Sequence, residues 1–305
     1  MAPQELRLQR ISEHLTIGST NCSRCCPTAD LSAASGDTEP RQPRSSTRSS
    51  SAVTRPEVGA AAELRVAAVQ ISGYDKGDLP HPGYDPVEQL LPYIQRAGRD
   101  GVDLVVFPEY VLGHIAVPGP STQQIAAAAK AAGVYIIVGC WEVAGDRLLN
   151  TALLFDRAGA IAGKYHKTHA AVDSMDESQP PWTAPPAGKS REWLLENDPE
   201  WVMERGQDLP VFVLEDIGLR VGILTCYDGW FPEPARELSL RGAEIIVWIN
   251  GRGGSVEDFI VQTTMFQSHV AMIATNQAYG AGTMIGGNRA ESDVSEEFLP
   301  AVSSP

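Results

Sequence analysis

The sequence predicts an α/β fold, because apolar segments of strand length alternate with segments of helical pattern along most of the chain. The apolar runs are continuous rather than alternating, which is typical of strands that are covered on both faces. Hydrophobic residues make up 43% of the 305 residues, enough to fill a sizeable core. We therefore expect most of the chain to fold into layers of sheet and helix.

The order of the elements follows from local patterns. The first strand is predicted over 64–71, because this run is almost continuously apolar. The first helix is predicted over 86–99, since Asp85 can cap its start and a proline suits its first turn. An alanine-rich helix is predicted over 121–132, with Ser121 as its cap. The other strands are expected over 103–107, 135–140, 151–156, 211–214, 220–224, 244–249 and 271–276, and the other helices over 233–241 and 257–270.

Two parts of the chain differ from this pattern. Residues 1–62 are rich in Ser, Thr, Pro and Arg and lack apolar periodicity, so we expect a disordered extension. An organelle transit peptide is the alternative, although the acidic residues of this segment are unusual for one. Residues 173–208 contain several prolines and are expected to be an insertion, which in a compact domain is a lid, a binding loop or disorder. The folded domain is therefore predicted over 63–287, with a polar tail over 288–305.

The net charge, the lack of long apolar segments and the spacing of the cysteines argue against several classes of protein. The net charge of −14 argues against nucleic acid and anionic membrane surfaces as partners, because both repel an acidic protein. No apolar run approaches the ~20 residues needed to span a bilayer, and residues 1–10 lack the apolar stretch of a signal peptide. Five unevenly spaced cysteines do not make a disulfide framework. We therefore expect a protein of a reducing compartment, cytoplasmic unless residues 1–62 target an organelle.

Three short segments, each at the end of an expected strand, present a glutamate, a lysine and a cysteine. They are Phe107-Pro108-Glu109, Lys164-Tyr165-His166-Lys167 and Leu224-Thr225-Cys226. Ligand sites in open α/β sheets lie at the carboxyl ends of strands, so these side chains can meet. A cysteine nucleophile needs a base to take its proton and a cation to stabilise the oxyanion, and these residue types supply both. Taken singly, Glu109 and Lys167 are equally compatible with a solvated surface.

Cys226 lies where an expected strand turns into a helix. Such a turn exposes the side chain at the top of the sheet and points backbone N–H groups, such as that of Tyr227, toward a developing oxyanion. We expect the start of the helix to lower the pKa of the thiol. A buried structural cysteine is the alternative for Cys226 considered alone.

The joint pattern of these segments resembles the nitrilase, or carbon–nitrogen hydrolase, superfamily over about residues 64–287. The resemblance rests on the F-P-E strand end, the K-Y-H-K-T-H segment and the cysteine turn in this order, and on residues 67–70 and 236–246. It implies a four-layer α-β-β-α sandwich with Glu109, Lys167 and Cys226 as the catalytic triad. It also implies that no metal or organic cofactor is required and that subunits pair as a homodimer across a helical surface.

The resemblance further implies a second glutamate near the lysine. Glu200 fits that position best, and Glu204 is the alternative. Lys167 and Cys226 are 59 positions apart in the sequence. This separation is longer than the resemblance leads us to expect, and the extra residues lie before Glu200. The identity of the second glutamate and the shape of the substrate pocket therefore stay open at this point.

Other cysteines and histidines are interpreted as non-catalytic. Cys140-Trp141-Glu142 matches the C-W-E signature of true nitrilases, but it follows the wrong strand and precedes no helix, so Cys140 is expected in the core. The cysteines at 22, 25 and 26 lack a matching pair at zinc spacing. His166 and His169 have a lysine neighbourhood that repels a cation. No metal site is therefore predicted.

The segment after Cys226 bears on the substrate. Tyr227–Glu233 resembles the corresponding segment of amidases, formamidases and carbamoyl-amide hydrolases, whereas nitrile-cleaving members usually carry Trp-Glu there. We therefore expect a hydrolase that cleaves a C–N bond of a small amide or N-carbamoyl compound through a thioester, with Tyr227 and Trp230 contacting the substrate. The alternatives are a nitrile-cleaving enzyme and a catalytically idle binding or scaffold protein on the same fold.

An isochorismatase-like hydrolase, which also combines an acid, a lysine and a cysteine, would need an aspartate on the first strand, where this chain has Val69-Gln70-Ile71.

The end of the domain departs from the resemblance. Residues 278–287 match it up to the point where closing strands should follow, but a polar, acidic stretch comes instead. We therefore expect the strand over 271–276 to be the last clear one and the domain to lack one or more closing strands. A missing strand leaves an open sheet edge, which a partner can complete.

Overall fold

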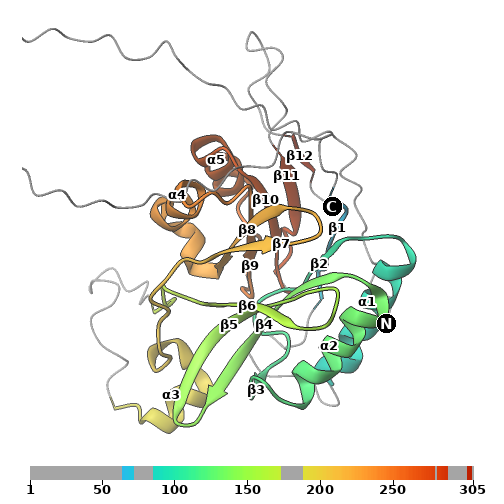
Figure 1. Cartoon of the computed structure of the whole chain (residues 1–305). Coiled ribbons are helices and arrows are strands. Elements are labelled where there is room, and N and C mark those ends of the chain that lie inside the picture. Colours follow the sequence, from blue (N-terminus) through green and yellow to red (C-terminus); the bar gives the residue numbers. More distant parts are fainter. Residues whose placement is uncertain (1–63, 72–84, 173–187, 279, 288–300, 304–305) are drawn as a thin grey trace, which may run out of the picture.

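The computed structural model describes residues 64–71, 85–172, 188–278, 280–287 and 301–303 (Figure 1). The extension over 1–62 and most of the tail over 288–305 lie outside this part of the chain, so both stay predictions. Within the described ranges, no helix combines the length and the apolar character needed to cross a membrane.

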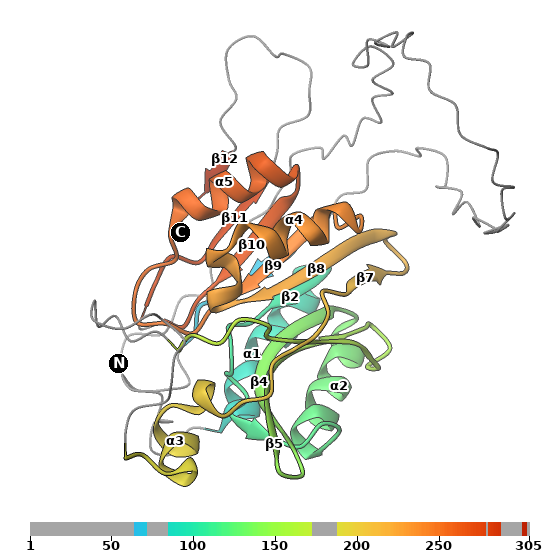
Figure 2. The ribbon, with the colours of Figure 1, turned by 90° about the vertical axis from the view of Figure 1, so that its left-hand side faces the viewer.

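Two six-stranded sheets lie face to face and form the centre of the molecule (Figure 1 and Figure 2). The first sheet has the order β1 (Val66–Ala68), β2 (Leu104–Val106), β4 (Tyr135–Ala144), β5 (Arg147–Phe155) and β6 (Ile161–His166), with β3 (His114–Ile115) beside β4. The second sheet has the order β12 (Ala301–Ser303), β11 (Met284–Gly287), β10 (Ala271–Thr275), β9 (Ile245–Ile249), β8 (Leu219–Thr225) and β7 (Val211–Leu214).

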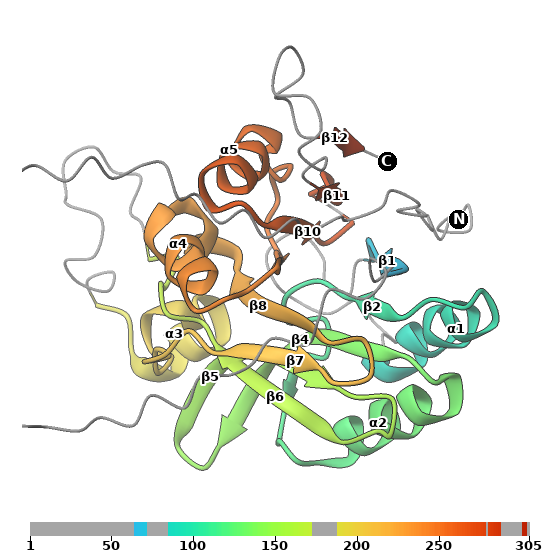
Figure 3. The ribbon, with the colours of Figure 1, turned by 45° about the horizontal axis from the view of Figure 1, so that its top comes forward.

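Helices cover the outer face of each sheet. α1 (Pro86–Arg99) and α2 (Pro120–Ala132) lie on the first sheet, and α4 (Pro232–Leu240) and α5 (Asp258–Ser268) lie side by side on the second (Figure 2 and Figure 3). The order of the layers is therefore α-β-β-α, which confirms the predicted four-layer sandwich.

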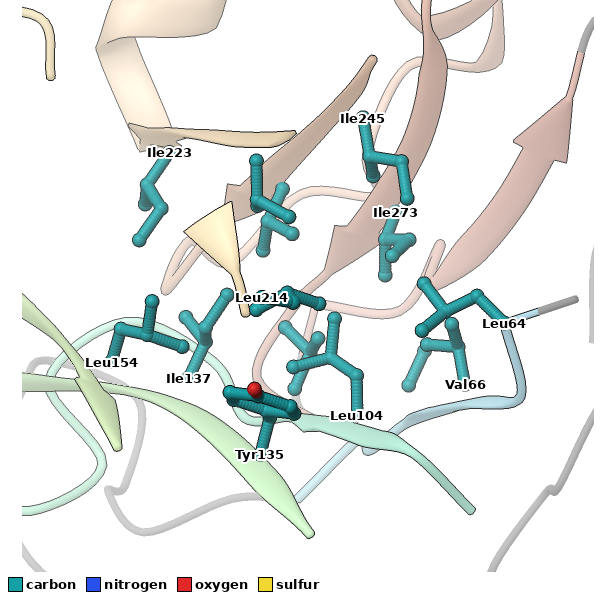
Figure 4. Close-up of a cluster of buried hydrophobic side chains, with 14 of the residues drawn as sticks. Leu64, Val66, Leu104, Tyr135, Ile137, Leu154, Leu214, Ile223, Ile245 and Ile273 are labelled. Carbon is teal, nitrogen blue, oxygen red and sulfur yellow. The ribbon is translucent and has the colours of Figure 1, made fainter. Parts of the chain in front are cut away.

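Apolar side chains fill the space between the two sheets and also the space under the helices. Leu104 and Ile137 of the first sheet meet Ile223 and Ile273 of the second in the central cluster (Figure 4). The neighbouring side chains on the same strands point the other way and pack against α1 and α2 or against α4 and α5. Both faces of central strands such as β2, β9 and β10 are buried, and this is why their apolar runs in the sequence are continuous.

The starts of the first two helices differ in how well the sequence predicts them. Asp85 caps α1 as expected, because its carboxylate accepts hydrogen bonds from two backbone N–H groups of the first turn, at 2.9 and 3.0 Å. The prediction of Ser121 as the cap of α2 is wrong. This helix begins at Pro120, and the hydroxyl of Thr122 accepts the N–H of the capping residue Gly119 at 2.8 Å.

Several elements were not expected. β11 pairs antiparallel with β10, and β12 pairs antiparallel with β11, so two strands extend the second sheet beyond the predicted strand over 271–276. β6 continues the first sheet and carries the lysine segment to its end. In the predicted insertion over 173–208, the described part includes the 3₁₀ helix η1 (Pro199–Trp201), which was not expected, and the helix α3 (Arg191–Asn197), which the sequence pattern does favour over 190–196.

Hydrogen bonds join the two sheets at the edge where their parallel strands end. The parallel group is β1, β2 and β4 in the first sheet and β8, β9 and β10 in the second. The Glu109 N–H donates to the Asn250 carbonyl at 3.2 Å, and the Gln277 side-chain amide donates to the Glu109 carbonyl at 2.8 Å. The loop after β2 is therefore tied to the loops after β9 and β10.

Candidate active site

Glu109 follows β2 in a tight turn that packs against β4. The next residue, Tyr110, has a left-handed backbone with φ of 42°. A Cβ atom on Gly139 of β4 would lie 2.5 Å from the Tyr110 nitrogen and 2.7 Å from the Glu109 Cα, closer than real Cβ atoms come. Glycine at 139 therefore lets the turn approach the strand and places the Glu109 carboxylate, which is 1% exposed, inside the molecule.

Lys167 lies between two carboxylates. Its ammonium is 3.1 Å from the Glu109 carboxylate and 2.6 Å from that of Glu200, and its side chain is 1% exposed. The side-chain amide of Asn150, on β5, donates to both glutamates at 2.7 and 3.2 Å. Four polar side chains thus form one buried cluster in which the charged groups are paired and hydrogen-bonded, as burial requires.

The structure distinguishes the two candidates for the second glutamate. Glu200, on η1, bonds Lys167 and also accepts the backbone N–H of Ala171 at 2.8 Å. Glu204 instead pairs with Arg147 through two hydrogen bonds at the surface of the molecule. Glu200 is therefore the candidate that lies in the cluster. It belongs to the predicted insertion over 173–208, whose length left the second glutamate open in the sequence analysis.

Cys226 lies at the tip of β8, where the chain turns into a short 3₁₀ helix, Cys226–Trp230, before α4. We call residues 225–231 the cysteine elbow. Cys226 has a left-handed backbone with φ of 47°, a strained conformation for a residue with a side chain that is found most often at functional sites. The indole N–H of Trp248 on β9 holds the elbow by donating to the Cys226 carbonyl at 2.8 Å.

The expectation that the helix start lowers the pKa of the Cys226 thiol is wrong. Burial raises this pKa, and the negative charge of Glu109 raises it further, while the positive charge of Lys167 opposes them. The thiol is therefore neutral in the resting protein. These charge interactions also mean that the cysteine elbow of the second sheet faces the cluster carried by the first.

The two partners of the thiol have shifted pKa values as well. Burial raises the pKa of Glu109, against the opposing effect of the Lys167 charge. Burial alone would lower the pKa of Lys167, but the charges of Glu109 and Glu200 outweigh it and hold this pKa well above its usual value. The lysine thus stays an ammonium, and the glutamate gains basicity near neutral pH.

Asp228 connects the cysteine elbow to the loop of residues 167–169, which we call the lysine loop. Its fully buried carboxylate accepts the hydroxyl of Tyr165 at 2.7 Å and the backbone N–H of Thr225 at 3.0 Å. The other oxygen accepts the N–H and the hydroxyl of Thr168 and the N–H of His169, at 3.2, 2.9 and 2.8 Å. One carboxylate therefore fixes the cysteine elbow and the lysine loop relative to each other.

Replacing this carboxylate is expected to destabilise the fold. Asp228→Asn puts an amide donor where an oxygen now accepts hydrogen bonds, so at least two buried donors lose their partner. The free energy of unfolding should fall by roughly 3 kcal/mol, as for buried groups left unsatisfied. Urea unfolding followed by circular dichroism measures this, with the exposed Asp146→Asn as the control. A loss for Asp228→Asn no larger than that of the control would contradict this role.

Tyr227 and Trp230 lie on the elbow next to each other, with ring centroids 5.4 Å apart. The Trp230 side chain is exposed over 44% of its surface, and the guanidinium of Arg252 lies 5.6 Å from its ring. Both predicted substrate-binding residues thus belong to the cysteine elbow, and the Trp230 side chain is partly exposed.

Of the residues interpreted as non-catalytic, Cys140 and His166 make no hydrogen bond or ion pair with the described side chains of the buried cluster, whereas His169 belongs to the lysine loop. Cys140 is buried in the apolar layer beneath α1 and α2. His166 lies 3.8 Å from the Glu142 carboxylate, and His169 contacts Asp228. Within the described ranges, no group of three or more potential metal ligands occurs.

Three site residues escaped the sequence analysis. Asn150, Asp228 and Arg252 enter the site through contacts with residues far away in the chain. Asn150 carried one usable signal, because it is a polar residue inside a strand that is otherwise apolar. Asp228 lies in the short 3₁₀ helix of the cysteine elbow and Arg252 in a loop, and a polar residue is ordinary in either place.

Comparison with known proteins bears on the family of this chain. Residues 65–295 match the sequence profile of the carbon-nitrogen hydrolase family. Formamidases of Bacillus cereus (strain G9842) and Bacillus anthracis are each 29% identical over 188 residues, 56% of this chain and 49% of theirs. The chain thus spans about half the length of the curated relatives it matches.

The fold also matches solved structures. A double mutant of the amidase from Nesterenkonia sp. AN1 in complex with acrylamide gives a TM-score of 0.57 at 17% identity, over 75% of this chain and 85% of that one. A mutant of the same amidase in complex with butyramide gives 0.56 at 17% identity, over 73% and 83%. At such low identity the likeness concerns the fold, and it agrees with the four layers described above.

Proposed function

Because this chain belongs to the carbon-nitrogen hydrolase family, we propose that it hydrolyses the C–N bond of a small amide or N-carbamoyl compound through a thioester on Cys226. The observation that carries the proposal is the buried lysine between two glutamates, at 3.1 and 2.6 Å, facing the cysteine elbow. This arrangement supplies a base, a cation and a nucleophile without a metal or an organic cofactor.

The first half of the reaction forms the thioester. Glu109 accepts the proton of the Cys226 thiol as the sulfur attacks the carbonyl carbon, and the carbonyl electrons move onto the oxygen. The Lys167 ammonium and the backbone N–H of Tyr227 stabilise this oxyanion. When the oxyanion collapses, the C–N bond breaks, and Glu109 returns the proton to the departing ammonia or amine.

The second half releases the product. Glu109, again a carboxylate, accepts a proton from water as the water oxygen attacks the thioester carbon. The C–S bond breaks, the sulfur leaves as a thiolate that regains the proton, and the acid product departs. Glu200 touches neither reacting atom in this scheme. It acts on Lys167, whose charge it maintains at 2.6 Å.

Two observations favour amides over nitriles. Tyr227 follows Cys226 where nitrile-cleaving members usually have tryptophan. The relatives found by sequence are formamidases, and the similar solved structures are those of an amidase. A catalytically idle protein on this fold is disfavoured, because the acid and the cation are in contact and their charges act on the thiol of Cys226.

The test is an ammonia-release screen of the full chain with formamide, butyramide, an N-carbamoyl amino acid and butyronitrile. We expect release from the amides or the carbamoyl compound and slower release from the nitrile. Absence of turnover with every compound, combined with no alkylation of Cys226 by a small electrophile at neutral pH, would favour the idle protein. A preference for the nitrile would overturn the substrate class.

The pH dependence of turnover follows from the raised pKa of Glu109. Only the carboxylate can accept the thiol proton, so kcat/KM should fall on acidification with a midpoint above 4.5, the ordinary value for glutamate. Glu200→Gln removes a negative neighbour that raises the pKa of Glu109, so its midpoint should move toward lower pH. A pH–rate profile of both proteins measures this. A wild-type midpoint at or below 4.5, or an upward shift in the variant, would contradict the role of Glu109.

The homodimer and the cytoplasmic location remain proposals. The outer face of α4 and α5 exposes three large apolar side chains, Leu240, Phe259 and Phe266, by 67%, 64% and 50%. Exposed apolar surface of this kind is typical of an interface. We expect sedimentation equilibrium to give twice the chain mass, and a monomer would contradict pairing through this face.

A further inference from the structure

Arg252 lies at the sheet edge that carries the proposed catalytic residues. β8 and β9 are parallel, and Thr225 at the end of β8 pairs with Ile249 at the end of β9. The loops that follow these strands therefore leave the sheet side by side, one with Cys226 and the other with Arg252. The mechanism proposed above gives Arg252 no part.

The backbone of Arg252 is fixed on both sides. Its N–H donates to the Asn276 side-chain oxygen at 3.1 Å, and the Asn276 amide donates back to its carbonyl at 3.3 Å. The carbonyl of Gly251 accepts the hydroxyl of Tyr110, the residue after Glu109. The loop thus holds a constant position relative to the buried glutamate, as a recognition residue requires.

The guanidinium of Arg252 lies over two indole rings that frame the cysteine. Its carbon is 5.3 Å from the Trp248 ring, which bonds the Cys226 carbonyl, and 5.6 Å from the Trp230 ring, which belongs to the cysteine elbow. Arginine stacks on aromatic faces in this way, and the stacking fixes the plane of its donors. Two aromatic rings therefore orient the guanidinium next to the nucleophile.

The hydrogen bonds of Arg252 leave a buried donor without a partner in the described part of the chain. Its two terminal nitrogens donate to the two oxygens of Glu257, at 3.1 and 2.5 Å. The Nε–H is buried and has no hydrogen-bond partner among the residues that the structure describes. Buried donors are nearly always satisfied, so an unsatisfied one beside a reactive cysteine points to an absent acceptor.

The charges of the site indicate what kind of acceptor fits. Glu109, Glu200 and Glu257 outnumber Lys167 and Arg252, so the site carries no spare positive charge for an anionic substrate. The acceptor that suits the Nε–H is therefore an uncharged oxygen.

We propose that Arg252 is a specificity-determining residue whose Nε–H donates a hydrogen bond to a neutral carbonyl or hydroxyl oxygen on the acyl part of the substrate, beyond the scissile carbonyl. This inference rests on the proposed function and deepens it. It assigns the site to uncharged amides with a second oxygen acceptor, in preference to purely aliphatic amides and to carboxylates.

The test compares neutral diamides with matched amides. Malonamide, succinamide and glutaramide are each compared with the branched aliphatic amide of the same length, and with the corresponding half-amide acid. We expect kcat/KM for the best diamide to exceed that of its aliphatic match by about 10- to 100-fold, the effect of one hydrogen bond to a charged donor. Arg252→Met should remove most of this ratio, whereas Arg99→Met, on the exposed side of α1, should keep it.

Arg252→Met leaves Glu257 without its partner, so the double variant Arg252→Met/Glu257→Gln is measured as well, with circular dichroism to check folding. Equal kcat/KM for diamide and aliphatic amide in the wild type, or a ratio that survives in both variants, would overturn the proposal. So would a preference for the half-amide acid.

A binding measurement distinguishes a failure of this inference from a failure of the proposed function. Calorimetry on Cys226→Ala, with and without Arg252→Met, measures affinity for the same diamides without any turnover. Tighter binding of a diamide than of its aliphatic match, lost with Arg252→Met, would support recognition by Arg252 even if no compound is hydrolysed. Equal affinities would refute it even if aliphatic amides are hydrolysed.

Discussion

Cys226→Ala is expected to lower ammonia release from the best amide by about 10⁴-fold or more, because the variant has no atom that can form the thioester. The other members of the site remain in place, so only binding and electrostatic stabilisation are left. Ammonia release measures the loss. Mass spectrometry of the protein mixed with substrate should show the mass of an acyl adduct in the wild type and none in the variant.

Cys140→Ala is the matched control for this experiment. Cys140 is a second free thiol, but it lies in the apolar layer under α1 and α2. Its replacement should cost about 1 kcal/mol of stability through the small cavity it leaves, with turnover and adduct retained. Full activity of Cys226→Ala, or an adduct that disappears with Cys140→Ala, would show that the nucleophile is assigned to the wrong residue.

Lys167→Met is expected to have the second largest effect, and on two quantities at once. Methionine has a similar length but no charge, so the carboxylates of Glu109 and Glu200 would face each other without the ammonium that now lies between them. The pKa of Glu109 would then rise further, and the base would be protonated near neutral pH. Turnover should fall by about 10³-fold, since the oxyanion also loses a charged partner.

The stability of Lys167→Met should fall together with its activity. Removing one member of a buried ion pair costs about 3–5 kcal/mol of unfolding free energy, which urea unfolding can measure. Adding Glu200→Gln removes one of the orphaned charges and should restore part of the stability but not the turnover. Lys130→Met on the exposed end of α2 serves as the control. Turnover near the wild-type value in Lys167→Met would refute its role at the oxyanion.

The sequence predicts the fold because its elements are locally encoded. Strands buried on both faces must be apolar throughout, so their positions and the α/β class follow from periodicity alone. The positions of Glu109 and Cys226 follow in the same way, since both come directly after such strands. β11 and β12 are short and lack a pattern of this kind, so pairing with β10 is what defines them.

Properties that depend on distant contacts could not be predicted. The thiol pKa of Cys226 illustrates this, because local reasoning considers only the helix start, whereas burial and the Glu109 carboxylate come from the folded state. The same holds for Asp228, whose donors lie up to 63 positions away. The resemblance pointed to Glu200, and the structure places this residue against Lys167, although an insertion of irregular sequence precedes it.

The hydrogen bonds that join the two sheets at the loop of Glu109 have a consequence for how this protein responds to stress. Glu109 and Lys167 follow strands of the first sheet, whereas Cys226 follows a strand of the second. The proposed catalytic residues therefore stay in place only while the two sheets keep their relative position. A slip of about 1 Å between them would cost on the order of 100-fold in rate while leaving every strand and helix intact. On warming, catalytic competence should therefore vanish before the chain melts.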